Sequence, residues 1–117
     1  MISDRDETVV SETTPGGTTV VRVHGDLDDD STPALTHALT AAADSGCSRT
    51  VVDLSRVGFA DSSALHALLA AQRTHTVTGT TLVLAGPLQT AVSRLFGVTS
   101  TGPVFRWADS AYEAMTC

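Results

Sequence analysis

The chain has few aromatic residues, few cysteines and few basic residues, and each shortage excludes a class of protein. Aromatics make up only 4% of its 117 residues, whereas hydrophobic residues make up 42%, so the core must be aliphatic. This hydrophobic fraction also argues against disorder. A chain of this length forms one domain, residues 1–117, and can bury roughly two-thirds of the surface exposed by its unfolded form.

Basic residues are too few and too scattered to form a nucleic-acid interface. Seven lysines and arginines stand against 13 acidic residues, which gives a formal net charge of −6. No basic stripe is present to hold the phosphates of DNA or RNA. The acidic balance predicts instead that a tight protein partner presents a basic or mixed face.

Metal-ligand patterns and long apolar runs are also missing. The two cysteines, Cys47 and Cys117, have no metal-site spacing and suggest no disulfide framework, and the four histidines are scattered. The aspartates at positions 26, 28, 29 and 30 lack the spacing of a calcium loop. The first residues are polar and acidic, and no stretch approaches the roughly 18 apolar residues that span a bilayer. We therefore expect a cytoplasmic protein with no metal, no cofactor and no membrane contact.

Strand and helix patterns alternate along the rest of the chain. β-branched runs predict strands at residues 7–14 and 18–24, joined by a turn at Pro15-Gly16-Gly17. Further strands are expected at residues 50–54, 82–84 and 104–107. Helices are expected from Ser31 or Asp30 to Gly46, from Ser62 to about His75, from Pro87 to Gly97, and from Asp109 or Ser110 onward. This order predicts an α/β layered domain with a mostly parallel central sheet, an N-terminal hairpin and four helices.

The most informative pattern lies between residues 50 and 69, where a β-branched strand and a turn lead into an apolar helix. Asp61 occupies the position of a helix N-cap, which puts Ser62 and Ser63 in the first turn. Unpaired NH groups and the positive end of the helix dipole favour negative charge there, and would satisfy part of the charge of a phosphoserine. The simpler interpretation is a helix cap with no regulatory role.

Residues 51–69 resemble the signature of the STAS domain as found in anti-sigma factor antagonists. In that signature a strand and a hydrophobic link lead to Asp-Ser-Ser/Thr-Gly-Leu at a helix start, and here the run is Asp61-Ser62-Ser63-Ala64-Leu65. Residues 21–28, Val-Arg-Val-His-Gly-Asp-Leu-Asp, look like the family's strand ending in Gly-Glu-Leu-Asp. Residues 32–35, 87–96, 104–105 and 110–114 also follow the family's order, so the resemblance covers nearly the whole chain.

The resemblance implies a binding protein that is switched by phosphorylation. In this family the unmodified protein binds a serine kinase that also acts as an anti-sigma factor, and phosphorylation of the first serine after the aspartate releases it. Carried over, the phosphoacceptor is Ser62, with Ser63 as the alternative. Asp26, Asp28 and Asp61 would form an acidic rim that faces the kinase.

Ser63, Ala64 and His66 complete the predicted partner surface, and two of them depart from the family pattern. Ala64 stands where glycine is usual, and His66 stands where a small residue is common. Alanine favours a helix more than glycine does, so we expect these departures to affect the kinase's approach and not the fold.

Two other functions compete with a phosphorylation switch. One is a STAS scaffold, or an accessory subunit of a signalling or transport assembly, without a working phosphoswitch. The other is a small hydrolase, because His66 follows Ser62 by one helical turn. The Gly-x-Ser-x-Gly turn that exposes a hydrolase serine is absent, so we predict no catalytic residues and no enzyme activity.

Overall fold

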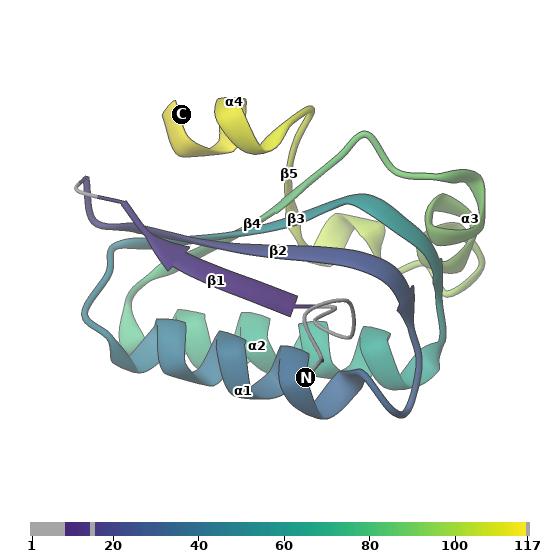
Figure 1. The fold of residues 1–117 in the computed structure, drawn as a ribbon, viewed down its shortest axis with the longest axis horizontal. Coiled ribbons are helices and arrows are strands. Elements are labelled where there is room, and N and C mark those ends of the chain that lie inside the picture. The colour runs from purple at the N-terminus through teal and green to yellow at the C-terminus, as the bar shows by residue number, and fades with distance from the viewer. Residues whose placement is uncertain (1–8, 15, 117) are drawn as a thin grey trace, which may run out of the picture.

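A five-stranded sheet forms the centre of the molecule, which the computed structural model describes over residues 9–14 and 16–116 (Figure 1). The strands β1 to β5 lie across the sheet in their sequence order, with β1 antiparallel to β2 and all other pairs parallel. This confirms the predicted hairpin and mostly parallel sheet. The strands are β1 (Val9–Thr13), β2 (Thr18–Leu27), β3 (Arg49–Ala60), β4 (Thr81–Ala85) and β5 (Arg106–Ala108).

Helices lie on both faces of this sheet. In Figure 1, α1 and α2 run side by side beneath it, α4 lies above it, and α3 lies at the end where β3 finishes. A short 3-10 helix, η2 (Gly102–Val104), precedes β5. Among the described residues, no helix combines the length and apolarity that a bilayer crossing requires. The helices are α1 (Thr32–Asp44), α2 (Ser62–Thr78), α3 (Thr90–Val98) and α4 (Ala111–Thr116).

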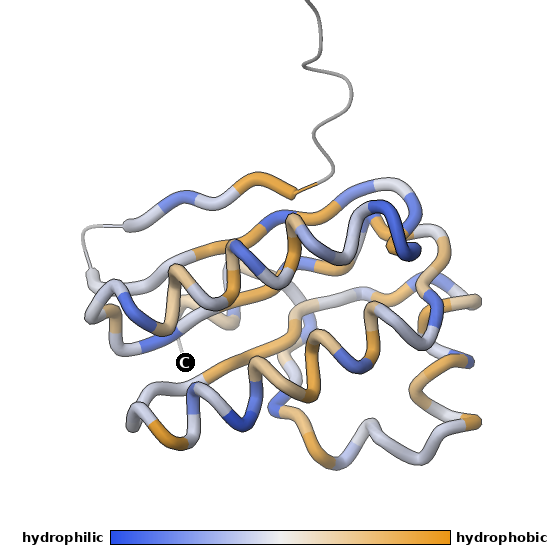
Figure 2. Tube along the Cα trace, turned by 90° about the horizontal axis from the view of Figure 1, so that it is seen from below, coloured by the Kyte–Doolittle hydropathy of each residue, from blue (hydrophilic) through white to orange (hydrophobic). Residues whose placement is uncertain are grey.

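The alternation of side chains along the strands divides the core between the two faces. On β2, Val21 and Val23 point into the larger cluster, which packs against α1, α2 and α3, whereas Val20 belongs to a smaller cluster beneath α4. Seen from the α1 and α2 side, both helices alternate between apolar and polar segments (Figure 2). Each helix therefore buries one stripe on the sheet and leaves the other in solvent.

Several predicted boundaries differ from the observed ones, and three of the differences lie near the end of β3. β3 continues to Ala60 instead of ending at residue 54, because its second half pairs with the second half of β2. Two bulges each place an extra residue in β3, one between Asp53 and Arg56 and one between Val57 and Phe59, and they interrupt the period-2 pattern that would reveal this pairing in the sequence.

The other two errors concern α3. Its first helical hydrogen bond runs from the Ser93 NH to the Gln89 carbonyl, at 2.9 Å, so the helix begins at Thr90 and not at Pro87. Gly97 lies inside the helix instead of closing it. At α1, Ser31 occupies the predicted N-cap position, but its side chain makes no capping hydrogen bond.

Candidate functional site

The predicted site lies at one end of the molecule, where β2 and β3 finish and α1 and α2 begin (Figure 1). Because β2 and β3 are parallel, their last residues are adjacent, with Asp26 paired to Phe59 and Leu27 paired to Ala60. The NH of Asp61 donates to the Leu27 carbonyl at 3.1 Å, which continues this contact beyond the strands. The start of α2 is thereby held against the end of β2.

Asp61 caps α2, as its sequence position predicts. Its backbone is extended (φ −107°, ψ −174°), and its Oδ1 accepts hydrogen bonds from the NH groups of Ser63, at 3.0 Å, and Ala64, at 3.2 Å. The Leu65 NH donates to the Asp61 carbonyl at 3.2 Å, which is the first intrahelical bond. The cap therefore satisfies two of the NH groups that a helix start leaves open.

Ser62 is the first residue of α2 and is exposed to solvent. Within the described part of the chain, its hydroxyl has no hydrogen-bond partner. Because Asp61 already occupies the NH groups of Ser63 and Ala64, a phosphate on Ser62 could not bind them without displacing the cap. The expectation that the helix terminus satisfies part of the phosphate's charge is therefore limited to the dipole and the NH of Ser62 itself, and most of that charge would face outward.

Ser63 has a different environment from its neighbour. It is half-buried, and its hydroxyl donates to Oδ1 of Asp29, in the turn that precedes α1. Sequence reasoning did not single out Asp29 as a partner of this helix start. The two residues are 34 positions apart, and only the pairing of β2 with β3 brings their segments together.

The other predicted partner-binding residues lie near this helix start, but not all of them offer a side chain. Asp26 is exposed and lies beside Gly58 of β3. Its Oδ1 is 3.8 Å from the position that a Cβ atom would take if Gly58 were substituted. His66 is exposed on α2, one turn after Ser62. Ala64 is fully buried, so its methyl group cannot contact a partner. Contrary to the prediction, it is therefore not part of the partner surface.

Asp28 organises the turn before α1. Its Oδ1 accepts hydrogen bonds from the Asp30 NH at 3.1 Å, the Ser31 NH at 3.2 Å and the Ser31 hydroxyl at 3.2 Å. Ser31 folds back in the same turn: its hydroxyl oxygen accepts from the Asp28 NH at 2.9 Å, and its single proton can be donated to the Asp26 carbonyl, at 3.1 Å, in place of Asp28 Oδ1. These bonds explain why Ser31 does not cap α1, and they fix the position of Asp29 within the turn.

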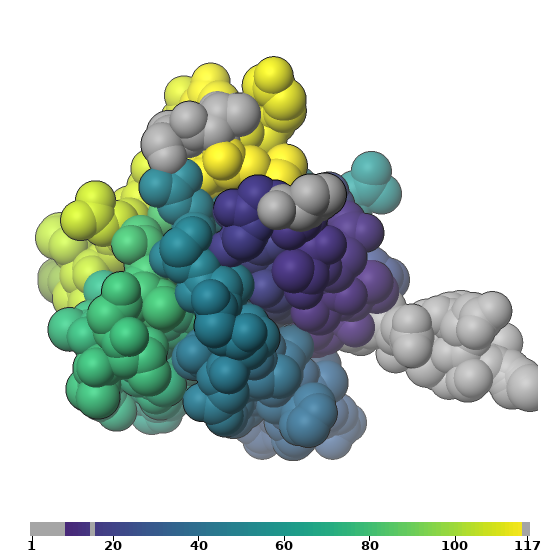
Figure 3. All heavy atoms as spheres, turned by 90° about the vertical axis from the view of Figure 1, so that its left-hand side faces the viewer, coloured from purple at the N-terminus to yellow at the C-terminus, as the bar shows by residue number. Residues whose placement is uncertain are grey.

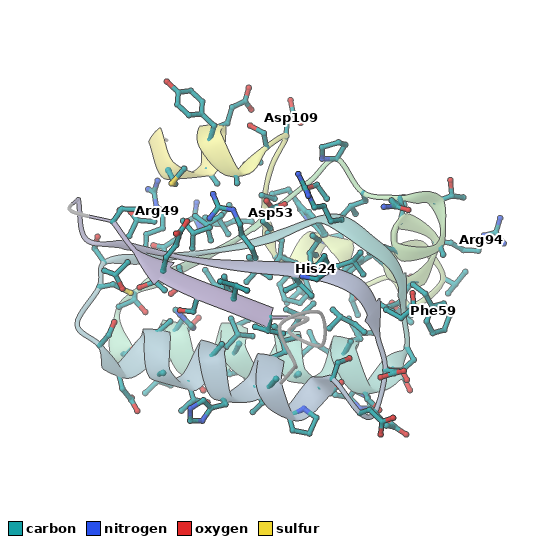
Figure 4. All side chains as sticks on the ribbon, viewed as in Figure 1. His24, Arg49, Asp53, Phe59, Arg94 and Asp109 are labelled. Carbon is teal, nitrogen blue, oxygen red and sulfur yellow. The ribbon has the colours of Figure 1, made fainter. Side chains whose placement is uncertain are left out.

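Phe59 is a neighbour of the site that sequence reasoning missed. Its side chain is 47% exposed, although it is one of only three phenylalanines in a chain poor in aromatics. Figure 4 places it beside α3, at the same end as Arg94 and at the opposite end from Arg49. The sequence carried no clear signal for this, because Phe59 lies in the hydrophobic link before the cap, where its neighbours Val57 and Ala60 are buried.

The site is acidic but does not form a metal centre. Four aspartates surround the start of α2, two of which, Asp28 and Asp61, are committed to local hydrogen bonds. In residues 9–14 and 16–116, no group of three histidine, cysteine or acidic side chains is placed to hold a metal ion. The four aspartates around the start of α2 are Asp26, Asp28, Asp29 and Asp61.

Comparison with known proteins agrees with this geometry. The sequence model described as "Mlab, STAS domain" matches residues 10–102, which include both the site and most of the core. The chain belongs to the STAS domain family. Its match to the crystal structure of an anti-sigma factor antagonist from Mycobacterium paratuberculosis has 31% identity and a TM-score of 0.76, covering 98% of this chain and 97% of the other.

Two more distant STAS-like structures share the fold. SpoIIAA in its unphosphorylated form, described as an anti-sigma factor antagonist, is 22% identical, with a TM-score of 0.77 and 92% of each chain covered. A sulfate transporter family protein from Wolinella succinogenes is 16% identical, with a TM-score of 0.70, covering 90% of this chain and 87% of the other. No curated protein sequence gives a significant match.

Proposed function

We propose that this STAS domain is an anti-sigma factor antagonist that binds an anti-sigma factor serine kinase and is released when Ser62 is phosphorylated. The observation that carries the proposal is the exposed hydroxyl of Ser62 at a helix start already capped by Asp61. The anti-sigma factor antagonist from Mycobacterium paratuberculosis supports the class of partner. The solved phosphorylated form of the Bacillus protein SpoIIAA supports the kind of modification.

The proposed modification is an ordinary phosphoryl transfer. The Ser62 oxygen forms a bond to the γ-phosphorus of ATP, the bond from that phosphorus to the bridging oxygen breaks, and ADP leaves. The hydroxyl proton passes to a base supplied by the kinase. The product carries a charge of about −1.5 to −2 where the free protein has none.

The added charge acts on the partner more than on the fold. Asp61 retains the helix NH groups, so the phosphate projects into the surface where the kinase would lie. Asp26 and Asp29 give this surface a negative charge already, which suits a basic or mixed partner face. A bulky dianion at its centre costs desolvation and displaces close contacts, so the complex dissociates.

The exposed residues around Ser62 form the proposed docking surface. Phe59 supplies an aromatic side chain, the residue type that most often anchors protein interfaces, and His66 extends the surface along α2. The proposed role is binding and not catalysis, and the proposed location is the cytoplasm. Ser63 stays the alternative acceptor.

Phosphorylation by purified anti-sigma factor serine kinases with ATP, followed by mass spectrometry, tests the proposal. We expect wild-type protein to be labelled on Ser62, and Ser62→Ala to bind the kinase normally without being labelled there. We expect Ser62→Asp to weaken kinase binding by about tenfold or more, which corresponds to roughly 1.4 kcal/mol. Ser48→Asp is the charge control, because Ser48 is an exposed serine next to the start of β3, at the other end of that strand. Its hydroxyl donates to the Gly17 carbonyl at 3.3 Å, so an unchanged fold of this variant is checked first by circular dichroism. Equal effects of the two aspartates on binding would refute the switch.

The second candidate function is a STAS module without a phosphoswitch, in a transport or signalling assembly. The fold match to a sulfate transporter family protein favours keeping it. This function predicts that no kinase labels Ser62 and that Ser62→Asp leaves partner binding unchanged.

A further inference from the structure

The two adjacent serines at the start of α2 differ in one respect that bears on phosphorylation. Ser62 is exposed, and its hydroxyl has no partner among the described residues, whereas the half-buried Ser63 donates its hydroxyl proton to the Asp29 carboxylate. Both serines lie in the first turn of α2, so their position in the helix does not by itself distinguish them as phosphate acceptors. The contact with Asp29 does.

We propose that Asp29 is a specificity-determining residue that directs phosphorylation to Ser62 and away from Ser63. The inference rests on the proposed function, since it assumes a kinase that reads this helix start. It goes beyond that function by assigning the choice between two neighbouring acceptors to a side chain from a different segment of the fold.

Two physical effects disfavour Ser63. Its hydroxyl must first leave a hydrogen bond to a charged carboxylate, which is stronger than a neutral one. The γ-phosphate of ATP, and then the phosphoserine, must also approach that same carboxylate, and like charges at contact distance repel strongly. The Ser62 hydroxyl has no carboxylate partner among the described residues, so it has no such bond to leave and no carboxylate in hydrogen-bond contact.

The turn before α1 explains why Asp29, and not another aspartate, has this role. Asp28 is held by the NH groups of Asp30 and Ser31, which fixes the turn and presents the next side chain, Asp29, to Ser63. Asp30 is exposed and carries the same charge, but within the described residues its carboxylate makes no hydrogen bond. Asp30→Ala is therefore a matched control for Asp29→Ala.

The test uses full-length protein, anti-sigma factor serine kinases with ATP, and site-resolved mass spectrometry. In a Ser62→Ala background, we expect Asp29→Ala to raise the label on Ser63 by about tenfold. Asp30→Ala in the same background should leave it unchanged. Asp29→Asn separates the two effects, because its amide oxygen still accepts the Ser63 proton but no longer repels phosphate. We expect it to give an intermediate label.

The outcomes separate this inference from the function on which it rests. If wild-type protein acquires no label on Ser62, the proposed function fails and the inference falls with it. If Ser62 is labelled but Ser63 stays unlabelled after Asp29→Ala, only the inference fails. A lower Ser63 label after Asp29→Ala, measured with kinase in saturating excess so that weaker docking is not the cause, also overturns it, since Asp29 would then act as a base that activates Ser63.

A second measurement needs no kinase. Ser63→Asp places a carboxylate against Asp29, so it should lower the Tm more than Ser62→Asp does. Asp29→Ala should restore most of the loss caused by Ser63→Asp and none of the loss caused by Ser62→Asp. Equal Tm values for the two serine variants, or no recovery with Asp29→Ala, would contradict the proposed repulsion.

Discussion

The two ends of α2 differ in how far their polar side chains are buried and hydrogen-bonded. At its start, Asp61 caps the helix from the surface and Ser62 is open to solvent. Near its end, His75 is only 1% exposed, and both of its ring nitrogens have partners: Nδ1 lies 2.8 Å from the Ala71 carbonyl and Nε2 lies 2.8 Å from the Thr50 hydroxyl. The first end can accept a new charge, whereas the second has no room for one.

The partners of His75 determine its hydrogen-bond pattern. A carbonyl only accepts, so in the neutral ring Nδ1 carries the proton and Nε2 accepts from the Thr50 hydroxyl. The buried Cys47 Sγ lies 3.6 Å from the same hydroxyl oxygen. Figure 3 shows this end of the molecule, where the segment between α1 and β3 lies between the hairpin and the segment that follows α2, with α4 above.

The same helix, α2, therefore has a solvent-exposed start that can be modified and a buried end that is held to β3 by hydrogen bonds. A modification of the exposed Ser62 side chain should leave the core unchanged, because the buried side chains that anchor α2 lie on its other face, from Ala64 and Leu65 to His75. Substitutions should therefore cost much stability at the His75 end and little at the Ser62 end.

The largest effect is expected for His75→Ala. The substitution leaves a cavity and a buried Thr50 hydroxyl without its partner, which together should lower the free energy of unfolding by about 3 kcal/mol. Urea unfolding followed by circular dichroism measures this. His66→Ala is the control, since it makes the same change at an exposed position of the same helix and should alter stability by less than about 0.5 kcal/mol. Similar losses for the two variants would remove the contrast between buried and exposed ends.

A smaller effect is expected for Thr50→Val, which keeps the shape of the side chain and removes its hydroxyl. Nε2 of His75 then has no donor, and the free energy of unfolding should fall by about 1–2 kcal/mol. In a His75→Ala background the same change should cost almost nothing, because the bond is already lost. Additive losses in the double variant would show that the two residues do not act together.

Loss of the cap ranks next. Asp61→Ala leaves the NH groups of Ser63 and Ala64 without an acceptor and should cost about 1 kcal/mol in unfolding free energy. Asp61→Asn keeps an acceptor oxygen at the cap and should retain most of the stability. If both variants lose the same amount, the charge of Asp61 and not its capping bonds supports the helix.

The smallest effect is expected for Ser62→Ala. The side chain is exposed and has no hydrogen-bond partner in the described part of the chain, so the free energy of unfolding should change by less than about 0.5 kcal/mol. Thermal unfolding of the two proteins side by side checks this. A loss above 1 kcal/mol would mean that the start of α2 is as rigidly anchored as its end.

Local patterns were enough to predict most of the fold and the type of site. β-branched runs gave the strands, and the step from strand to apolar helix placed Asp61 at the cap, because both signals lie within a few residues. The same rules failed at the second half of β3, where two bulges in that strand interrupt the alternation. They also placed Ala64 on the surface, although it is fully buried.

By itself, the sequence determined the α/β order, the aliphatic core and the aspartate that opens α2, since each depends on neighbours along the chain. Only the tertiary structure decided which serine is free and which is held, and which histidine is buried. Those outcomes depend on contacts across 34 residues for Asp29 and Ser63 and across 25 residues for Thr50 and His75. No local pattern encodes such pairs, because the first exists only once β2 pairs with β3 and the second only once α2 packs back along β3.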